Sequence, residues 1–409
     1  MRLIHSSQEG ITSAFEERFG ASPTHLVRAP GRVNLIGEHT DYNDLPVLPM
    51  AIQREVRMVF RPRDDGMVVL HDVDSEFPSV EFEILPGIPK DEDGHWANYV
   101  KGPADLLARR FAIWRGFDGV IGSDIPVAAG LSSSSAIVMA VGLALARINE
   151  VPVDDRSFPE LMGDAEHFTG TRGGAMDHAI SLGARRGCAA KITFKPLRLR
   201  HVQLPADWCF VVADTGKRAE KSGAVQNVYN TRRSECEEAL SFVVEDVVRK
   251  DMTRMIPTDY PSLLRALAVE DLLPIAEGVL PSNLLRRFRH VVTEAARVDQ
   301  AIDLMRAADV TRFGTLMDAS HGSLRTDFLM STRELDELAA IAREGGAAGA
   351  RLTGAGLGGS IVALADRSTV DGVIENLVTE YYEPRRLAMR LDERLFLAGA
   401  VGGASIREL

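Results

Sequence analysis

Residues that could carry out chemistry are concentrated in three glycine- and hydroxyl-rich segments of this 409-residue chain. Residues 28–43 hold two arginines, two glycines and the run Glu-His-Thr-Asp. Residues 126–135 end in four consecutive serines, and residues 353–360 include four glycines. Glycine lets the backbone approach a ligand closely, while clustered carboxylates and an imidazole suit the hydroxyls of a sugar. The three segments together predict a phosphate and a polyol as ligands.

The serine-rich segment predicts a phosphate site, because a predicted strand at residues 119–126 precedes it and a predicted helix at 136–149 follows it. Amides at the start of a helix lack intrahelical acceptors and carry partial positive charge, so they favour an anion. Gly130 would let a phosphate approach, and Ser132–Ser135 would supply hydroxyl donors, N-capping oxygens and a magnesium ligand. A capped helix without a ligand explains the same residues, so the loop alone leaves both interpretations open.

This segment fits two common serine motifs poorly. It lacks the Gly-Lys-Ser/Thr ending of a Walker A loop, and it lacks the Gly-x-Ser-x-Gly elbow of a serine hydrolase.

The run that contains Glu38, His39 and Asp41 predicts recognition of paired hydroxyls on a sugar ring, because it offers several acceptors and one donor within four residues. A site that binds a hydroxyl leaves its own groups unpaired when that hydroxyl is absent or inverted, so such a site selects strongly. Metal binding is a weaker interpretation, since the His-Glu-x-x-His spacing is absent.

In this order the three segments resemble the signature motifs of the GHMP small-molecule kinases, and Gly31-Arg-Val-Asn-Leu-Ile-Gly-Glu-His-Thr-Asp-Tyr42 resembles the galactokinase signature. The resemblance continues through Trp96–Gly102, Met176-Asp177 and Tyr229–Glu238, so it covers nearly the whole chain. It implies an ATP-dependent, magnesium-requiring sugar 1-kinase that converts D-galactose to α-D-galactose 1-phosphate.

The resemblance also implies a two-lobed GHMP kinase fold that combines α/β and α+β parts. The N-terminal lobe would resemble the second domain of ribosomal protein S5, and the C-terminal lobe would be a ferredoxin-like α+β domain. We place the N-terminal domain, with the sugar signature and the phosphate loop, at residues 1–200. The C-terminal domain, with the third glycine-rich motif, would span residues 201–409. Two domains also suit a chain of this length.

For ATP, the resemblance implies that Ser134 and Glu166 hold the magnesium ion and that Trp96 packs against adenine. Taken alone, Glu166 reads as a helix carboxylate and Trp96 as a core residue. The third loop, with Gly354 and Gly356, would brace the phosphate loop, although a tight hairpin needs similar glycines. The residues implied to wrap the phosphates are Gly130, Leu131, Ser132, Ser133, Ser134 and Ser135.

For the transfer step, the resemblance places Asp177 beside the anomeric hydroxyl and Arg32 between that carboxylate and the phosphate. Phosphoryl transfer needs an acceptor held in line, neutralised charge and a place for the proton. A neighbouring guanidinium favours the ionised carboxylate. The sequence leaves open whether Asp177 removes the proton early or mainly orients the hydroxyl, and without the resemblance the two residues read as an ordinary ion pair. The implied sugar contacts are Glu38, His39, Asp41, Gly174 and Tyr229.

Several positions depart from the galactokinase pattern. Leu45-Pro46 stands where galactokinases carry Gly-Phe, and His178 replaces a glutamine. The segment 166–177 looks more like the N-acetylgalactosamine kinase and plant-galactokinase branch, and Arg172 suits a carboxylated sugar. Galactose remains the expected substrate, with N-acetylgalactosamine, arabinose or galacturonate as alternatives. A non-catalytic galactose and ATP sensor is disfavoured, because the serine loop and both implied catalytic residues are intact.

Composition limits the other function classes. A formal net charge of −11 disfavours nucleic acid and anionic membranes as partners. No apolar run reaches the length of a membrane span, and the first residues lack a signal-peptide core. We therefore expect a cytoplasmic monomer or weak homodimer that binds a sugar and ATP. Cys188, Cys209 and Cys236 lack a Cys-x-x-Cys pair, which disfavours a disulfide framework or a zinc site.

Apolar periodicity predicts the elements that must position these residues. Helices are predicted at residues 6–19 and 96–111, with an extended segment from Leu26 that ends at Pro30-Gly31. A strand meander is predicted over residues 47–59, 67–70 and 80–85. Helical patterns dominate residues 224–342, with breaks near 257–261 and 281–282, before a strand-like return around the third loop.

Overall fold

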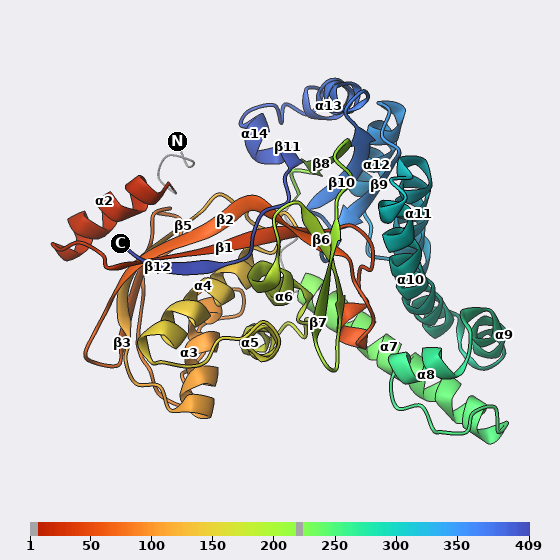
Figure 1. The fold of residues 1–409 in the computed structure, drawn as a ribbon, viewed down its shortest axis with the longest axis horizontal. Coiled ribbons are helices and arrows are strands. Elements are labelled where there is room, and N and C mark those ends of the chain that lie inside the picture. The colour runs from red at the N-terminus through yellow and green to blue at the C-terminus, as the bar shows by residue number, and fades with distance from the viewer. Residues whose placement is uncertain (1–6, 218–223) are drawn as a thin grey trace. The chain divides into compact units, whose positions relative to one another are not determined.

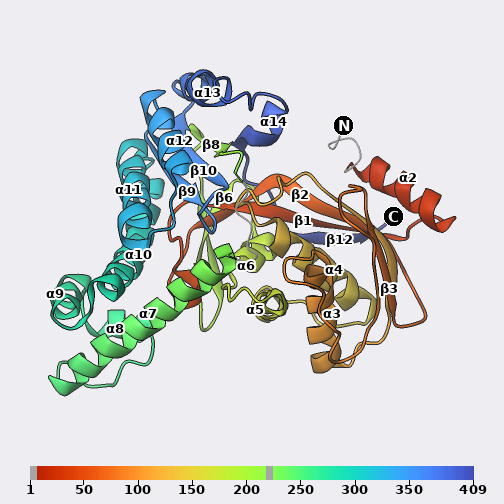
Figure 2. The ribbon, with the colours of Figure 1, turned by 180° about the vertical axis from the view of Figure 1, so that it is seen from behind.

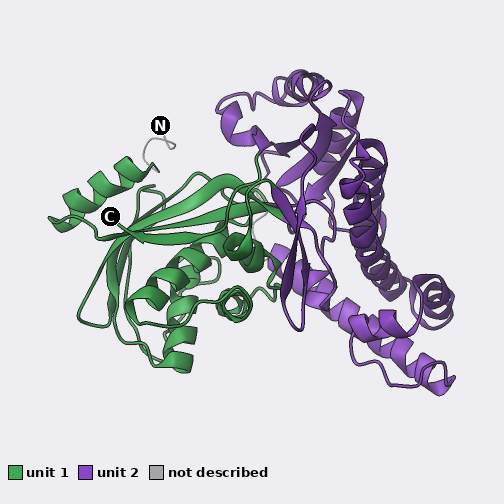
Figure 3. Ribbon diagram, in the orientation of Figure 1, with its two compact units in different colours: residues 1–32, 50–187, 399–409 green, residues 33–49, 188–398 purple. Residues whose placement is uncertain are grey.

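The computed structural model describes residues 7–217 and 224–409, and Figures 1 and 2 show its fold from opposite sides. The chain forms two compact units (Figure 3). Unit 1 comprises residues 1–32, 50–187 and 399–409, and unit 2 comprises residues 33–49 and 188–398. The predicted domains, 1–200 and 201–409, stay a prediction, because compactness alone does not show which segments fold independently.

Unit 1 is built on a six-stranded sheet in the order β12-β1-β2-β5-β3-β4. The strand β3 pairs with β5 in parallel and with β4 in antiparallel. The C-terminal strand β12 pairs in antiparallel with the start of β1, from His25↔Glu408 to Arg28↔Ser405. The strands are β1 (His25–Asn34), β2 (Pro49–Pro62), β3 (Met67–Asp72), β4 (Val80–Glu83), β5 (Phe117–Ser123) and β12 (Ser405–Glu408).

The predicted strand meander is wrong, because β5 lies between β2 and β3 in the sheet. Alternating apolar residues identify the strands, but they do not show which strands are neighbours in the sheet. The position of β5 between two strands agrees with its burial, since six of its seven residues are buried.

The predicted end of the extended segment at Pro30-Gly31 is also wrong, since β1 continues through both residues. Pairing with β12 covers only residues 25–28, so the missing amide of Pro30 removes no bond to that strand.

Helices cover both faces of this sheet (Figures 1 and 2). On one face α2 buries Ile11 and Phe15 against Leu26, Val59 and Val120. The side chain of its N-cap residue Ser7 accepts a hydrogen bond from Gly10, while Ser6, the predicted first residue, lies outside the described residues. The helices of unit 1 are α2 (Gln8–Phe19), α3 (Ala97–Phe111), α4 (Ser133–Ile148), α5 (Ser157–Glu166), η2 (His167–Thr169) and α6 (Met176–Gly183).

Unit 2 contains a four-stranded antiparallel sheet in the order β11-β8-β10-β9 and a separate hairpin of β6 and β7. The predicted boundary at residue 200 lies within β7. The strands are β6 (Cys188–Thr193), β7 (Arg198–Gln203), β8 (Trp208–Asp214), β9 (Gly349–Thr353), β10 (Ser360–Asp366) and β11 (Leu395–Ala398).

The predicted helical half of the chain is confirmed, including both breaks. Asp259 caps α8 with Pro261 in the first turn, and α10 begins directly after Pro281. The helices of unit 2 are η1 (Asp41–Asn43), α7 (Ala224–Arg249), α8 (Tyr260–Ala266), α9 (Val269–Val279), α10 (Ser282–Arg306), α11 (Val310–Ser323), η3 (Leu324–Phe328), α12 (Arg333–Glu344), α13 (Val370–Leu377), η4 (Val378–Tyr382) and α14 (Leu391–Arg394).

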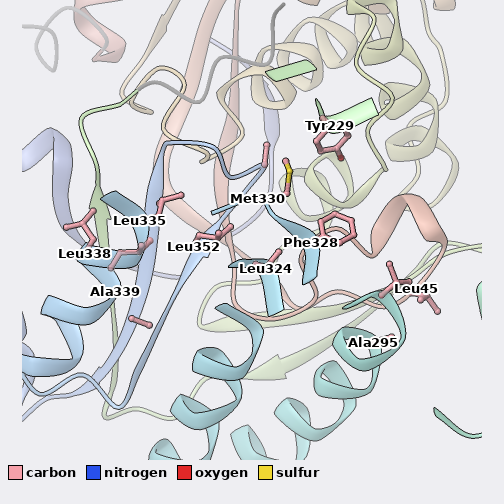
Figure 4. Packing of buried hydrophobic residues seen from close by; sticks show 14 of the residues in the cluster. Leu45, Tyr229, Ala295, Leu324, Phe328, Met330, Leu335, Leu338, Ala339 and Leu352 are labelled. Carbon is pink, nitrogen blue, oxygen red and sulfur yellow. The ribbon is translucent and has the colours of Figure 1, made fainter. Parts of the chain in front are cut away.

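The core of unit 2 includes part of residues 31–46, which we call the signature segment. Leu45 is buried in the same apolar cluster as Tyr229, Phe328 and Met330 (Figure 4). Burying one leucine contributes about 1.5–3 kcal/mol. Leu45, which departs from the galactokinase pattern, therefore packs into the core of unit 2.

Two predictions from composition can be compared with the structure. The cysteines Cys188, Cys209 and Cys236 are free thiols. Within residues 7–217 and 224–409, no helix combines the length and the apolar character that crossing a membrane would require.

The close approach of α11 to β9 predicts a large effect of one methyl group. A Cβ atom at Gly314 would lie 2.0 Å from the carbonyl oxygen of Ala348, so Gly314→Ala must displace backbone. We expect this variant to lose about 1–3 kcal/mol of stability. Gly278→Ala is the matched control, because a Cβ in this α9 position meets no atom within 4 Å and should stabilise the helix slightly. Thermal unfolding that shifts equally in both variants would contradict the packing described here.

Candidate active site

Arg32 and Asp177, which are 145 residues apart in the sequence, meet in unit 1. Arg32 extends from β1, and Asp177 lies in the first turn of α6. Nε of Arg32 donates to Oδ1 at 2.7 Å, and Nη2 donates to Oδ2 at 3.0 Å. Both residues are buried, with exposed fractions of 4% and 9%. The paired geometry fixes the orientation of the carboxylate.

Arg32 also holds the serine-rich loop of unit 1. Its Nη1 donates to the carbonyl oxygen of Gly130 at 2.6 Å, and its backbone amide donates to Leu131 at 3.1 Å. A Cβ at Gly31 would lie 2.7 Å from the same Leu131 oxygen, so only glycine fits there without a shift. Gly130 itself has φ of 75°, a conformation that favours glycine. One guanidinium thus links the loop to Asp177.

The predicted N-capping role of the first serine is wrong. Ser132 is the N-cap residue of α4, but its side chain makes no cap hydrogen bond, and its φ of 64° is left-handed. Its hydroxyl instead donates to Oδ2 of Asp177 at 2.5 Å. The interpretation of this segment as a serine-capped helix therefore loses its main support. Because Ser132 does not cap them, the first amides of α4 suit an anion at the positive end of the helix dipole.

A second carboxylate, that of Glu166, contacts the last residue of the serine run. The hydroxyl of Ser135 donates to Oε2 of Glu166 at 2.7 Å, and Nε2 of His178 is 3.1 Å from the same oxygen. Glu166 was paired with Ser134 in the sequence-based prediction, whereas the structure brings it to Ser135. A carboxylate beside serine hydroxyls provides oxygen donors, the ligands that Mg²⁺ prefers, so these residues fit the implied ion.

The other residues implied in ATP and sugar binding by unit 1 are placed as follows. Nε1 of Trp96 donates to the carbonyl oxygen of Pro78 at 2.9 Å, and its ring meets Phe77 edge-on. This is the geometry of a core tryptophan, and packing against adenine stays a prediction. Gly174 is partly buried in the irregular segment that leads into α6. The remaining loop serines, Ser133 and Ser134, are the first two residues of α4.

In unit 2, Glu38 is held at its backbone and at its side chain. Its amide donates to Oε1 of Glu294 at 3.2 Å, and its carbonyl oxygen lies 3.0 Å from Nε2 of His290. Its Oε2 accepts from Nη2 of Arg351 at 2.9 Å and from the amide of Gly354 at 3.1 Å. These contacts fix the position of the carboxylate in a buried environment.

His39 is a buried neutral imidazole among aromatic rings. Burial lowers the pKa of His39 to about 3. Its Nδ1 lies 3.0 Å from the hydroxyl of Tyr42, and its Nε2 lies 3.2 Å from the carbonyl oxygen of Ala355. Its ring also packs against Tyr229 and Phe328. These contacts anchor His39 within unit 2, and its implied sugar contact stays a prediction.

The other implied sugar residues of unit 2 lie beside this imidazole. Asp41 begins η1 and is buried, with 8% of its surface exposed. Tyr229, on α7, is buried, and its ring meets Tyr42 edge-on with the ring centroids 5.4 Å apart.

The third glycine-rich loop is the hairpin between β9 and β10, which closes at the pair Thr353↔Ser360. Gly354 has φ of 83° and presents its amide to Glu38. At Gly356 a Cβ would lie 2.1 Å from the carbonyl oxygen of Met330. Within unit 2 these glycines therefore support the signature segment and allow a close backbone approach, while their implied role beside the phosphates stays a prediction.

Sequence reasoning missed three residues that hold Glu38, namely His290, Glu294 and Arg351. Burial alone would raise the pKa of Glu294, but Arg297, His290 and Arg351 together hold it below its usual range. The spacing of His290 and Glu294, which places both on one face of a helix, was an available signal. Arg351 carried a weaker signal, as a lone charge within the strand that leads to the third loop.

Three family models match the chain. The galactokinase galactose-binding signature matches residues 13–62, the GHMP kinase N-terminal domain matches 98–184, and the GHMP kinase C-terminal domain matches 301–383. These matches confirm the expected GHMP kinase fold class.

Curated relatives include the galactokinase of Chloroflexus aurantiacus, 38% identical over 95% of this chain and 96% of that protein. The galactokinase of Chloroflexus aggregans is 39% identical over 91% of both chains. Among solved structures, Lactococcus lactis galactokinase complexed with galactose matches with a TM-score of 0.84 and 30% identity, over 96% of this chain and 98% of that one. Methanococcus jannaschii mevalonate kinase, 17% identical with a TM-score of 0.58, shares the fold.

The buried histidines of unit 2 predict acid sensitivity. Burial lowers the pKa of His39 to about 3 and the pKa values of His290 and His321 to about 4. The unfolded chain binds these protons below about pH 6.5, so stability is complete above that pH and falls toward the folded pKa values. Each histidine contributes a slope of about 1.4 kcal/mol per pH unit within that window.

We expect the melting temperature to fall between about pH 7 and pH 5, a range above the titration of ordinary carboxylates. His290→Gln keeps an amide donor for Glu38 but removes one titrating group, so its melting temperature should fall less over the same range. An equal fall in the variant and in the unaltered protein would contradict this assignment.

Proposed function

Because the chain belongs to the galactokinase family of the GHMP kinases, we propose that it transfers the γ-phosphoryl group of ATP to the anomeric hydroxyl of D-galactose. The products are ADP and α-D-galactose 1-phosphate. The observation that carries this proposal is the buried contact of Asp177 with both Arg32 and Ser132, which links a carboxylate to the loop that precedes α4. The solved relative from Lactococcus lactis supports the choice of sugar, since it is complexed with galactose.

In the proposed reaction the anomeric oxygen forms a bond to the γ-phosphorus, and the bond from that phosphorus to the bridging oxygen breaks. ADP leaves with the electron pair, and Asp177 receives or directs the hydroxyl proton. Arg32 keeps this carboxylate oriented and ionised, and its charge stabilises the transferring group. A general base of this kind contributes about 10²–10⁴-fold to the rate.

Unit 1 would bind ATP through the loop residues Gly130–Ser135 and the start of α4. Ser134 and Glu166 would hold a magnesium ion, with Ser135 orienting Glu166 through the hydrogen bond described above. When bound, the ion would neutralise phosphate charge during transfer. Trp96 would contact the base, and Gly354 and Gly356 would support the nucleotide loop.

Unit 2 would recognise the sugar through Glu38, His39, Asp41 and Tyr229, with Gly174 of unit 1 as a backbone donor. The burial of Leu45 favours a packing role for the changed residues at 45–46, so they offer no reason to prefer another sugar. The proposed protein is a cytoplasmic monomer or weak homodimer that binds sugar and ATP, without nucleic acid or membrane partners.

The proposed function is tested by ADP release from ATP in the presence of single sugars. We expect release with galactose and much less with glucose, N-acetylgalactosamine, arabinose or galacturonate. Asp177→Asn should reduce kcat by at least about 10²-fold, because it removes the proton acceptor but keeps the shape of the side chain. Its melting temperature serves as the folding control. Release with none of these sugars would overturn the proposal, and tight binding of galactose and ATP without ADP release would indicate a sensor.

The magnesium requirement is tested separately by titrating Mg²⁺ into metal-depleted protein. We expect no turnover after chelation and full recovery when Mg²⁺ is restored. Glu166→Gln should raise the Mg²⁺ concentration for half-maximal rate about 10–100-fold, since a neutral amide replaces the carboxylate ligand. Asp164→Asn is the matched control on the same helix, because its side chain is 66% exposed. An unchanged Mg²⁺ dependence in Glu166→Gln would remove Glu166 from the proposed metal site.

A further inference from the structure

Arg351 is a fully buried cation in unit 2, on β9 at the edge of the four-stranded sheet. Its exposed fraction is 0%, and it heads the largest fully buried side chains among the described residues. It lies on β9 opposite Val362 of β10. A guanidinium at such a position must give up its hydration, which costs several kcal/mol before any contact is counted, as order-of-magnitude estimates for buried ions indicate.

Among the described residues, both acceptors of hydrogen bonds from the Arg351 side chain belong to the signature segment. Its Nη1 donates to the carbonyl oxygen of Asn34 at 2.9 Å, and its Nη2 donates to Oε2 of Glu38 at 2.9 Å. Its Nε has no hydrogen-bond partner within the described part of the chain. The guanidinium therefore bridges residues 34 and 38.

Two residues that follow Arg351 in the chain bind the same segment. The hydroxyl of Thr353 accepts from the amide of Asn34 at 3.0 Å, and the amide of Gly354 donates to Glu38. The end of β9 and the following loop therefore hold the signature segment at several points in succession. Arg351 is the member of this set that contacts the Glu38 carboxylate with a full positive charge.

A buried ion pair contributes little net stability, because well-packed apolar side chains of the same volume often stabilise a fold equally well or better. What the pair does supply is a fixed place and a fixed charge for the carboxylate. Glu294 and His290 hold the backbone of Glu38, so the residue is constrained at its amide, its carbonyl and its side chain. The arrangement suits a carboxylate that must present the same lone pairs to each substrate molecule.

We propose that Arg351 is a positioning residue for the sugar, which acts by fixing the carboxylate of Glu38 and thereby sets the affinity for galactose. The inference rests on the proposed function, because it assigns Glu38 to a sugar hydroxyl. A carboxylate that rotates away from its bound orientation must be reordered by each substrate, and that cost appears as a higher KM for the sugar. ATP does not contact Glu38 in this scheme, so its KM should not respond.

The test compares the KM for galactose, the KM for ATP, kcat and the melting temperature in a set of full-length variants. Arg351→Met should raise the KM for galactose about 10–100-fold, as expected for losing a hydrogen bond to a charged group, and should leave the KM for ATP within about twofold. Arg351→Lys keeps the charge but cannot span both acceptors, so its KM for galactose should lie between those of Arg351→Met and the unaltered protein. If Arg351→Met does not fold, Arg351→Lys still decides the question.

Arg287→Met is the matched control for loss of a buried arginine. Arg287 is 3% exposed and also donates to one carboxylate, Glu235, and one backbone carbonyl, at Asp327, but neither belongs to the signature segment. Its replacement should lower the melting temperature while the KM for galactose stays close to that of the unaltered protein. A purely structural role for Arg351 would make the two variants alike.

Glu38→Gln completes a double-mutant cycle. If Arg351 acts through Glu38, adding Arg351→Met to Glu38→Gln should raise the KM for galactose less than about threefold further, although each change alone has a large effect. Three results would overturn the inference: an unchanged KM for galactose in Arg351→Lys and Arg351→Met, an equal increase in Arg287→Met, or effects that multiply fully in the double variant. Unaltered protein that phosphorylates no sugar would instead overturn the proposed function, so the two failures are distinguishable.

Discussion

The buried pair of Arg32 and Asp177 is the interaction on which the rest of the proposed chemistry depends. Charges of this kind are costly to bury, and removing one partner from such a pair typically costs about 3–5 kcal/mol because the other remains unpaired. Here the pair also holds the serine-rich loop in place. Arg32 reaches the carbonyl of Gly130, and Asp177 accepts from Ser132, so the loop, the strand and α6 share one hydrogen-bond network. Displacing either charge would move the loop that precedes α4.

Unit 2 contains a second buried carboxylate that is held by an arginine, at Glu38. The surrounding backbone is also constrained, because His39 adopts a left-handed φ of 62° although it is not glycine. Such conformations persist where neighbouring contacts enforce them, and here Tyr42, Asn43 and Ala355 contact His39 itself. In both units a carboxylate is ordered before any ligand arrives, which lowers the entropic cost of binding.

Local patterns predicted most helices and their breaks, since apolar periodicity and proline positions act over a few residues. They failed for strand order in unit 1, where β5 separates β2 from β3. They also failed at Pro30, because whether a proline disrupts a strand depends on which neighbouring strand needs its amide. The motifs predicted which residues form the site but not all of their hydrogen bonds. Ser132 donates to Asp177 and does not cap α4, and Glu166 accepts from Ser135 although Ser134 was its predicted partner.

The sequence by itself determined the family, the residue types available for chemistry and the elements on which they lie, because these follow from motifs and from spacing along the chain. Only the tertiary structure decided which side chains meet. Arg32 contacts Asp177, which is 145 residues away in the sequence, and Arg351 contacts Glu38, which is 313 residues away. The tertiary structure also shows that the hydroxyl of Ser132 donates to Asp177 and does not cap the helix. Contacts over such separations depend on how strands and helices pack, and no local pattern encodes that packing.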